Sequence, residues 1–374
     1  MKKLILFLSL MFGVGVLSTF AQTQSESPHL FGSSKFMLTG NAEAKFIADS
    51  GSVNFGDVSF KPIFLWHLSD RLFIEAETEI ATGPEGVELV LEYVNMCYFV
   101  NDYVAIHAGR FLPKFGAYRG RLGEGFINRY GNNPVGFGDG GIGPMIETGV
   151  GLQGGVPLGS AKMNYDFWVS NGPNLIDGSA DPDNAGQFDY EAYADNNKDK
   201  AIGGRVGLLP FSNSSLELGF SFENAAKTGA AHSALENTGV LMTAFDLEYF
   251  KAISPLKSTI RIIGEYKNQK VDNVNYVNSD STTYTFDNNS SAMYGSFSIR
   301  PTASQNKIFR NFELGFRYSA FDRPKEAHWG SEKQLTQTAV ALDYWLRWNS
   351  LVKFTWAKNS DSDNVYIVQF VYGF

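Results

Sequence analysis

One long stretch of the chain, residues 112–146, concentrates charge and glycine without any regular hydrophobic pattern. Its candidate functional side chains are Lys114, Arg119, Arg121, Glu124 and Arg129. Its glycines, which permit sharp bends, include Gly116, Gly120, Gly123 and Gly125. A stretch of this length without secondary structure usually serves a function or is mobile. Charges held around a narrow aqueous space sort ions and solutes by their electric field. We therefore expect a charged constriction, and the alternative is a solvated external loop.

Two other patterns suggest ligand chemistry. Residues 136–141 match the nucleotide-binding pattern G-x-G-x-x-G, but no strand-to-helix unit follows them, and we expect a flexible loop. Residues 177–199 offer carboxylate oxygens of the kind that calcium prefers: Asp177, Asp181, Asp183, Asp189, Glu191, Asp195 and Asp199. Ala185 and Ala192 stand where EF-hand spacing needs ligands. A solvated acidic loop is therefore the favoured interpretation, and calcium binding is the alternative.

Residues suited to catalysis are scattered along the chain. The histidines fall on separate segments: His29, His67, His107, His232 and His328. No Ser or Cys nucleophile stands in a recognisable motif, so no catalytic residue, metal site or cofactor is predicted. The sequence predicts that the protein is not an enzyme.

Alternation of apolar and polar residues runs through nearly the whole chain. It is clear from Phe36 to Phe46, from Leu72 to Ile80 and from Met163 to Val169. A period of two marks a strand with one apolar and one polar face. We predict sixteen strands, near residues 35–46, 56–68, 71–81, 87–100, 103–111, 147–157, 161–170, 201–209, 215–223, 240–251, 257–267, 291–300, 310–320, 336–347, 351–358 and 364–374.

The connections between these strands alternate between short and long. Short ones are residues 69–70, 101–102 and 158–160, and long ones are residues 112–146, 171–200, 224–239, 268–290 and 321–335. Short periplasmic turns and long external loops are typical of an outer-membrane barrel, whose closure leaves no strand edge in lipid. We predict an all-β fold, a transmembrane antiparallel β-barrel of about 16 strands, as the single domain of residues 22–374. Parity places these charged residues on the pore wall: Glu43, Lys45, Glu75, Glu77, Glu79, Arg205, Arg261 and Arg317.

The N-terminus has the features of a secretory signal peptide over residues 1–21. Lys2 and Lys3 precede an apolar run, and small residues precede a cleavage site after Ala21. Removal of two lysines takes the formal charge from −8 to −10, which does not support nucleic-acid binding. The single Cys97 cannot form an internal disulfide. These features predict export to the outer membrane of a Gram-negative bacterium, in contact with its lipid.

Aromatic and apolar residues share one parity at the C-terminus and are expected to face lipid. They are Tyr366, Val368, Phe370, Tyr372 and the terminal Phe374. This ending resembles the recognition signal of outer-membrane barrel proteins. The resemblance implies that the barrel assembly machinery is a partner of this chain.

Several stretches resemble the porin family that includes the phosphate-selective porins. They are residues 108–116, 126–128, 170–173, 204–207, 313–319 and 342–346, and they are spread over the whole mature chain. The resemblance implies a sixteen-stranded homotrimer with a loop folded into each pore. It implies passive diffusion of small hydrophilic solutes or ions, with anions such as phosphate among the candidates. An outer-membrane barrel enzyme, and a barrel that acts in adhesion or structure through its external loops, are the alternatives. Phosphate selection in that family relies on dense arginine and lysine, whereas Glu75, Glu77 and Glu79 point inward here.

Overall fold

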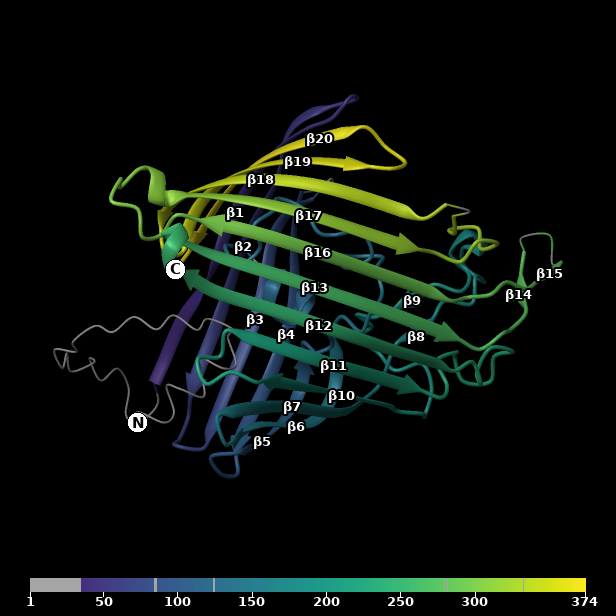
Figure 1. Ribbon diagram of the computed structural model, residues 1–374. Coiled ribbons are helices and arrows are strands. Elements are labelled where there is room, and N and C mark those ends of the chain that lie inside the picture. Colours follow the sequence, from purple (N-terminus) through teal and green to yellow (C-terminus); the bar gives the residue numbers. More distant parts are fainter. Residues whose placement is uncertain (1–34, 84–85, 124, 279, 281, 332) are drawn as a thin grey trace.

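The computed structural model describes residues 35–374 except 84, 85, 124, 279, 281 and 332. Sixteen antiparallel strands close into one barrel, in which the last strand pairs with the first (Figure 1). This confirms the predicted fold class and strand number. The predicted signal peptide, residues 1–21, lies outside the described residues. None of the helices in the described part of the chain is long and apolar enough to span a membrane.

The barrel strands follow one another around the wall in chain order. They are β1 (Lys35–Ala48), β2 (Val53–His67), β3 (Leu72–Gly83), β4 (Gly86–Phe99), β5 (Val104–Phe111), β6 (Glu147–Leu158), β7 (Ala161–Ser170), β10 (Ala201–Leu209), β11 (Leu216–Ala225), β12 (Val240–Ile253), β13 (Ser258–Val271), β16 (Ser290–Arg300), β17 (Phe312–Asp322), β18 (Leu335–Arg347), β19 (Ser350–Asn359) and β20 (Asn364–Gly373). Each corresponds to one predicted strand, with ends that differ by a few residues.

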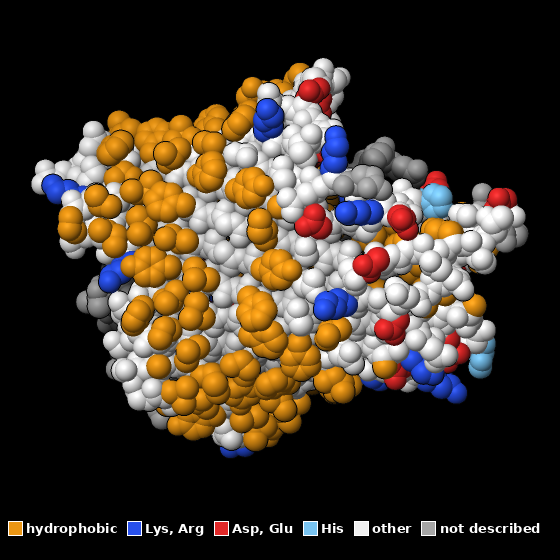
Figure 2. All heavy atoms as spheres, turned by 45° about the vertical axis from the view of Figure 1, so that its right-hand side comes forward, with side chains coloured by type: hydrophobic (Ala, Val, Ile, Leu, Met, Phe, Trp, Pro, Cys, Tyr) orange, Lys and Arg blue, Asp and Glu red, His pale blue; other side chains and the backbone are white. Residues whose placement is uncertain are grey.

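The strands have two chemically different faces, because successive side chains point to opposite sides of a sheet. On β20, Tyr366 and Phe370 point outward with more than half of their surface exposed, whereas Ile367 and Gln369 point inward and are buried. Figure 2 shows apolar side chains gathered over the outer surface, with most of the charged side chains toward the end that carries the long loops. An outer apolar band of this kind suits contact with lipid.

The two ends of the barrel differ. At the end that holds the C-terminus, which we call the turn end, most connections are short, but residues 301–311 form a longer one that contains the 3₁₀ turn η4 (Phe309–Asn311). At the opposite end, the loop end, lie the five predicted long connections, together with short turns at residues 49–52 and 360–363 (Figure 1). The predicted alternation of short and long connections therefore has exceptions at both ends.

The long connections at the loop end pack against one another. They contain two small hairpins, one of β8 (Asn174–Leu175) and β9 (Phe188–Asp189), the other of β14 (Tyr276–Val277) and β15 (Thr283–Tyr284), and the 3₁₀ turn η2 (Pro182–Asn184). Leu175, Leu235, Tyr276 and Phe286 form a buried cluster drawn from three of these connections. The loops on that side therefore have a hydrophobic core of their own.

The barrel closes where β1 meets β20, and the C-terminal residue takes part in that closure. The Phe374 N–H donates to the Gly40 carbonyl at 3.0 Å, and the Gly40 N–H donates to the Phe374 carbonyl at 3.2 Å. The Thr39 hydroxyl donates to the same Phe374 carbonyl at 2.6 Å. The Phe374 ring also stacks on Phe60 of β2, with 5.3 Å between ring centroids. The last residue thus joins three strands at the turn end.

Candidate functional site

Residues 112–146 enter the barrel after β5 and pack against the inside of its wall. Phe115 and Phe137 are fully buried in a cluster that includes Ile263 and Tyr294 of the wall. The rings of Phe137 and Tyr294 meet edge to face, with 4.8 Å between centroids. Burial of these aromatic side chains favours the inward position over a solvated one. We call this segment the inner loop.

A single turn of π-helix in the inner loop, η1 (Tyr118–Leu122), is fixed to the wall where it begins. Glu265 of β13 accepts hydrogen bonds from the N–H groups of Ala117 at 3.0 Å and Tyr118 at 2.8 Å. Gly116 precedes them with φ +67°, and a Cβ atom there would lie 1.9 Å from Glu265 Oε1. Glycine is therefore required at this position by both the backbone angle and the close approach of the carboxylate.

Arg119 lies among carboxylates from three different parts of the chain. Its guanidinium is 3.0 Å from Glu191 of the 171–200 connection, 3.8 Å from Asp139 of the inner loop and 3.9 Å from Glu92 of β4. Burial raises the pKa of the Glu191 carboxyl, an effect that Arg119 opposes and Asp139 reinforces. One fifth of the Arg119 side chain remains exposed, so this charge reaches the aqueous lumen.

Arg121 and Arg205 share two carboxylates on the wall. Arg121 lies 2.7 Å from Glu217 and 3.6 Å from Asp246, and Arg205 lies 3.0 Å from Glu217 and 2.6 Å from Asp246. Burial alone would lower the pKa of Arg121, but Glu217, Glu248 and Asp246 raise it. The two arginines and two carboxylates compensate one another, which lowers the cost of holding them away from bulk water.

The two remaining cations predicted in the inner loop also have wall partners. Lys114 Nζ lies 3.2 Å from Asp166 and donates to Gln153 Oε1 at 2.6 Å. Arg129 donates to Glu313 Oε1 at 2.9 Å, and its guanidinium lies over the Trp345 ring at 4.8 Å. Glu124, the acidic residue predicted beside them, lies outside the described residues.

The wall residues predicted on β1 and β3 face the lumen with partial exposure. Lys45 pairs with Asp57 at 3.3 Å, and Glu79 pairs with Lys61 at 3.3 Å, with about a quarter of the Lys45 and Glu79 side chains exposed. Three further acidic residues lie on this side. Glu43 accepts a hydrogen bond from the Gln369 side chain, Glu75 accepts one from the Tyr93 hydroxyl, and Glu77 is nearly fully buried. Water therefore reaches the inner wall along β1 to β3.

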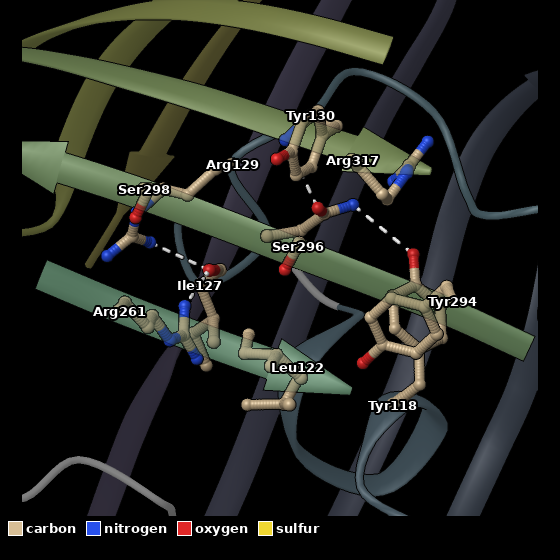
Figure 3. Close-up of a pocket in the computed structure, with 12 residues that line it drawn as sticks. Tyr118, Leu122, Ile127, Arg129, Tyr130, Arg261, Tyr294, Ser296, Ser298 and Arg317 are labelled. Carbon is tan, nitrogen blue, oxygen red and sulfur yellow. Dashed lines mark hydrogen bonds between the residues drawn. The ribbon is translucent and has the colours of Figure 1, made fainter. Parts of the chain in front are cut away.

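The predicted wall residues Arg261 and Arg317 lie behind the inner loop rather than beside open water. Both are at least nine-tenths buried. They line a space of about 370 Å³, which includes parts open to solvent, between the loop and strands β13, β16 and β17. Figure 3 shows Tyr118, Tyr130 and Arg129 on the loop side of this space, with Arg261 and Arg317 on the strands. Charged side chains on the wall that the inner loop covers are therefore less exposed than those along β1 to β3.

The carboxylates Asp166, Glu217 and Glu313 are the main wall partners that sequence reasoning did not single out. Alternation on β7, β11 and β17 places each of them inward, so parity was the available signal. Their partners lie 52 residues away for Asp166 and Lys114, 96 for Glu217 and Arg121, and 184 for Glu313 and Arg129. The alternation along a strand predicts on which face of the sheet a side chain lies, but not which loop residue will contact it.

The two ligand-like patterns serve local structure. Within residues 136–141, Phe137 is fully buried, and a Cβ at Gly136 would lie 2.6 Å from Ala292 of the wall, so this turn is packed rather than loose. In the acidic stretch, Asp181 accepts from the N–H of Asp183 at 3.1 Å, and Asp195 pairs with Lys200 at 2.5 Å. Over residues 35–374, apart from the six left undescribed, no group of three or more His, Cys, Asp or Glu side chains is placed to hold a metal ion.

Comparison with known proteins shows likeness in fold rather than in sequence. No family model and no curated protein sequence matches the chain. Solved structures do match: the outer membrane channel DcaP of Acinetobacter baumannii (TM-score 0.57, 12% identity, 91% of this chain and 97% of that one), the anion-selective porin from Comamonas acidovorans (0.51, 13%, 91% and 100%), and the trimer form of OmpT, an outer membrane protein of Vibrio cholerae (0.51, 10%, 92% and 100%). The chain, a sixteen-stranded barrel, therefore shares its fold with these outer-membrane protein structures.

Proposed function

We propose that this protein is an outer-membrane porin of a Gram-negative bacterium, through which small hydrophilic solutes diffuse passively. The observation that carries the proposal is the closed barrel with an apolar outer face and a charged lumen that the inner loop narrows. Barrels with apolar residues outside and polar residues inside span outer membranes, and in porins the polar interior is a water-filled channel. Solved structures of the same fold include an outer membrane channel and an anion-selective porin. Diffusion requires no cofactor.

We assign the role of constriction to the inner loop, with Lys114, Arg119, Arg121 and Arg129 as its charges and Glu124 as a further candidate. Each of the four cations has a carboxylate partner within 4 Å. The field that a passing ion meets is therefore a mixture of both signs, which favours weak selectivity. Passage of anions such as phosphate is the second candidate, supported by the four cations of the loop.

We further propose that the protein is a homotrimer. The wall formed by β19, β20, β1 and β2 has only short turns at the loop end, so no long connection covers it there. Its outer face carries strongly exposed apolar residues, including Phe55 and Val53. An apolar wall with short turns at the loop end suits contact with neighbouring copies.

Recording from planar bilayers tests the channel and the trimer together. The purified full-length protein should raise the current in discrete, ohmic steps, and a trimer should close in three equal sublevels at high voltage. A folded barrel that gives no current would contradict the channel and favour an enzyme or an adhesive barrel. Single-level closure would contradict the trimer while leaving the channel in place.

Assembly in the membrane gives a separate prediction. We propose that the barrel assembly machinery recognises the last strand, and Phe374 also closes the barrel through hydrogen bonds and a ring stack. Deletion of Phe374 should lower the amount of folded protein in the outer membrane by at least about tenfold, since each hydrogen bond lost contributes roughly 1 kcal/mol and about 1.4 kcal/mol is a tenfold change in an equilibrium. Export to the periplasm should be unchanged. Phe309→Ala, which removes an exposed ring at the turn end, is the control, and equal yields from the deletion and the wild type would refute the proposal.

A further inference from the structure

Five buried charged side chains of the wall form hydrogen bonds to the backbone of the inner loop. The inner loop lacks a regular hydrogen-bonding ladder, yet buried N–H and C=O groups need partners. The wall provides charged partners from β13, β17 and β19: Arg261, Glu265, Lys267, Arg317 and Lys353. We call these five side chains the anchor residues.

The four cationic anchors each donate to a different loop carbonyl. Arg261 Nη1 donates to Ile127 at 3.0 Å, and Arg317 Nη1 donates to Asn132 at 2.9 Å. In the same way, Lys267 Nζ donates to the Ile142 carbonyl at 3.1 Å and Lys353 Nζ to the Gly125 carbonyl at 2.8 Å. Hydrogen bonds from charged donors are about twice as strong as neutral ones, so the loop is held at four points between residues 125 and 142.

Glu265 is the anionic member of the five anchor residues. It accepts from the N–H groups of Ala117 and Tyr118 at the start of η1, as described above. Neutral side chains add to this: Ser221 accepts from the Gly116 N–H and Thr355 accepts from the Gly131 N–H, both at 3.0 Å. The loop is therefore attached to the wall at both of its ends and in its middle.

We infer that Arg261, Arg317 and Lys353 are positioning residues, which hold the inner loop and thereby set the width of the passage. This inference rests on the proposed function, because it assumes that solutes pass beside the loop. Arg261 and Arg317 are cationic and point inward, as residues that filter solutes would. Both lie under the loop, however, as does Lys353, and at most 9% of each of the three residues is exposed. Lys114 and Arg119, by contrast, expose 31% and 20% of their side chains. Charges at the surface of the lumen act on solutes, and buried anchors act on the loop.

Arg317 offers the cleanest test, because its hydrogen-bond partners are neutral. Its guanidinium bonds to the carbonyl and side-chain oxygens of Asn132 and to Gln337, and it stacks on the Tyr130 ring at 4.3 Å. Replacing it leaves none of these partners as an unpaired carboxylate. Arg261→Gln would instead release Glu248, which accepts from Arg261 at 3.0 Å.

In planar bilayers, Arg317→Met should raise the mean single-channel conductance by roughly twofold and increase current noise, because a released loop widens and fluctuates within the passage. The reversal potential in a salt gradient should stay close to the wild-type value. Arg317→Lys should restore most of the wild-type behaviour by keeping one donor. Arg347→Met, which removes an exposed arginine at the turn end, is the matched control.

A second readout does not depend on conduction. Trypsin should cut folded Arg317→Met after Arg119, Arg121 or Arg129, as found by mass spectrometry, and should not cut the wild type or Arg347→Met at these three sites. A shifted reversal potential with unchanged conductance and no cleavage would make Arg317 a filter residue and overturn the inference. Protein that is cleaved as expected but never conducts would support the anchors and contradict the proposed channel.

Discussion

Changing Arg119 and Arg121 together to alanine should shift the reversal potential of the channel strongly toward cations in a dilute salt gradient. The two arginines face carboxylates of the wall, and the exchange leaves Glu191, Glu217 and Asp246 without these partners. Two unit charges about 4 Å apart interact by about 1 kcal/mol even in bulk water, so the ratio of cation to anion permeability should rise by roughly fivefold. This ratio should change more than in any other variant considered for this lumen.

The salt dependence of the shift distinguishes a field effect from a change of shape. The shift should be large at 0.1 M salt and small at 1 M, because the Debye length falls from about 10 Å to about 3 Å. The double variant Arg310→Ala with Arg347→Ala removes two exposed arginines at the turn end and should leave the ratio unchanged. An unchanged reversal potential in the Arg119 and Arg121 variant at low salt would mean that these residues do not line the passage.

Gly116→Ala should displace the start of the inner loop and destabilise the barrel. A side chain at φ +67° costs about 1 kcal/mol. The added methyl group would also lie 1.9 Å from Glu265 Oε1, and relief of such overlap costs a further 1–3 kcal/mol, roughly. If the carboxylate moves instead, Ala117 and Tyr118 lose their acceptor. Either response should lower the midpoint of thermal unfolding and raise the single-channel conductance.

The same loop contains a matched control. Gly140 has φ +74°, yet nothing lies within 4 Å of the position its Cβ would take. Gly140→Ala therefore bears the backbone cost alone. Thermal unfolding followed by circular dichroism, together with conductance, should show a much smaller change for Gly140→Ala than for Gly116→Ala. Equal effects would mean that the contact with Glu265 contributes little to the position of the loop.

The barrel could be predicted from sequence because its main signal is local. Alternation from Phe36 to Phe46, and at fifteen other places, reports a two-faced strand wherever it occurs, and the closed order follows when each strand pairs with its neighbour. The exception at residues 301–311 shows the limit. The predicted strands near 291–300 and 310–320 already left room for a longer turn there, because alternation fixes the strands but not the length of the turn between them.

The use of the inward charges could not be predicted in the same way. The alternation predicted Arg261 and Arg317 on the inner face, and both are there. It could not predict whether a residue on that face lines the open lumen or lies under the inner loop. That distinction depends on where the inner loop lies, and its position is decided by contacts such as that of Lys353 with Gly125, 228 residues apart. No periodic pattern reports contacts of that range.

The anchor residues bind backbone atoms, and every amino acid has the same backbone carbonyl. Exposed side chains of the inner loop can therefore be exchanged without removing the attachment of the loop to the wall. A library that randomises Lys114 and Arg119 while keeping the anchors, Arg121 and Gly116 should yield mostly folded barrels with diverse permeabilities. The width of the passage thus depends on the anchor residues and the loop backbone, whereas its selectivity for ions and solutes depends on exposed loop side chains. Substitutions can therefore change the selectivity in evolution while the width is kept.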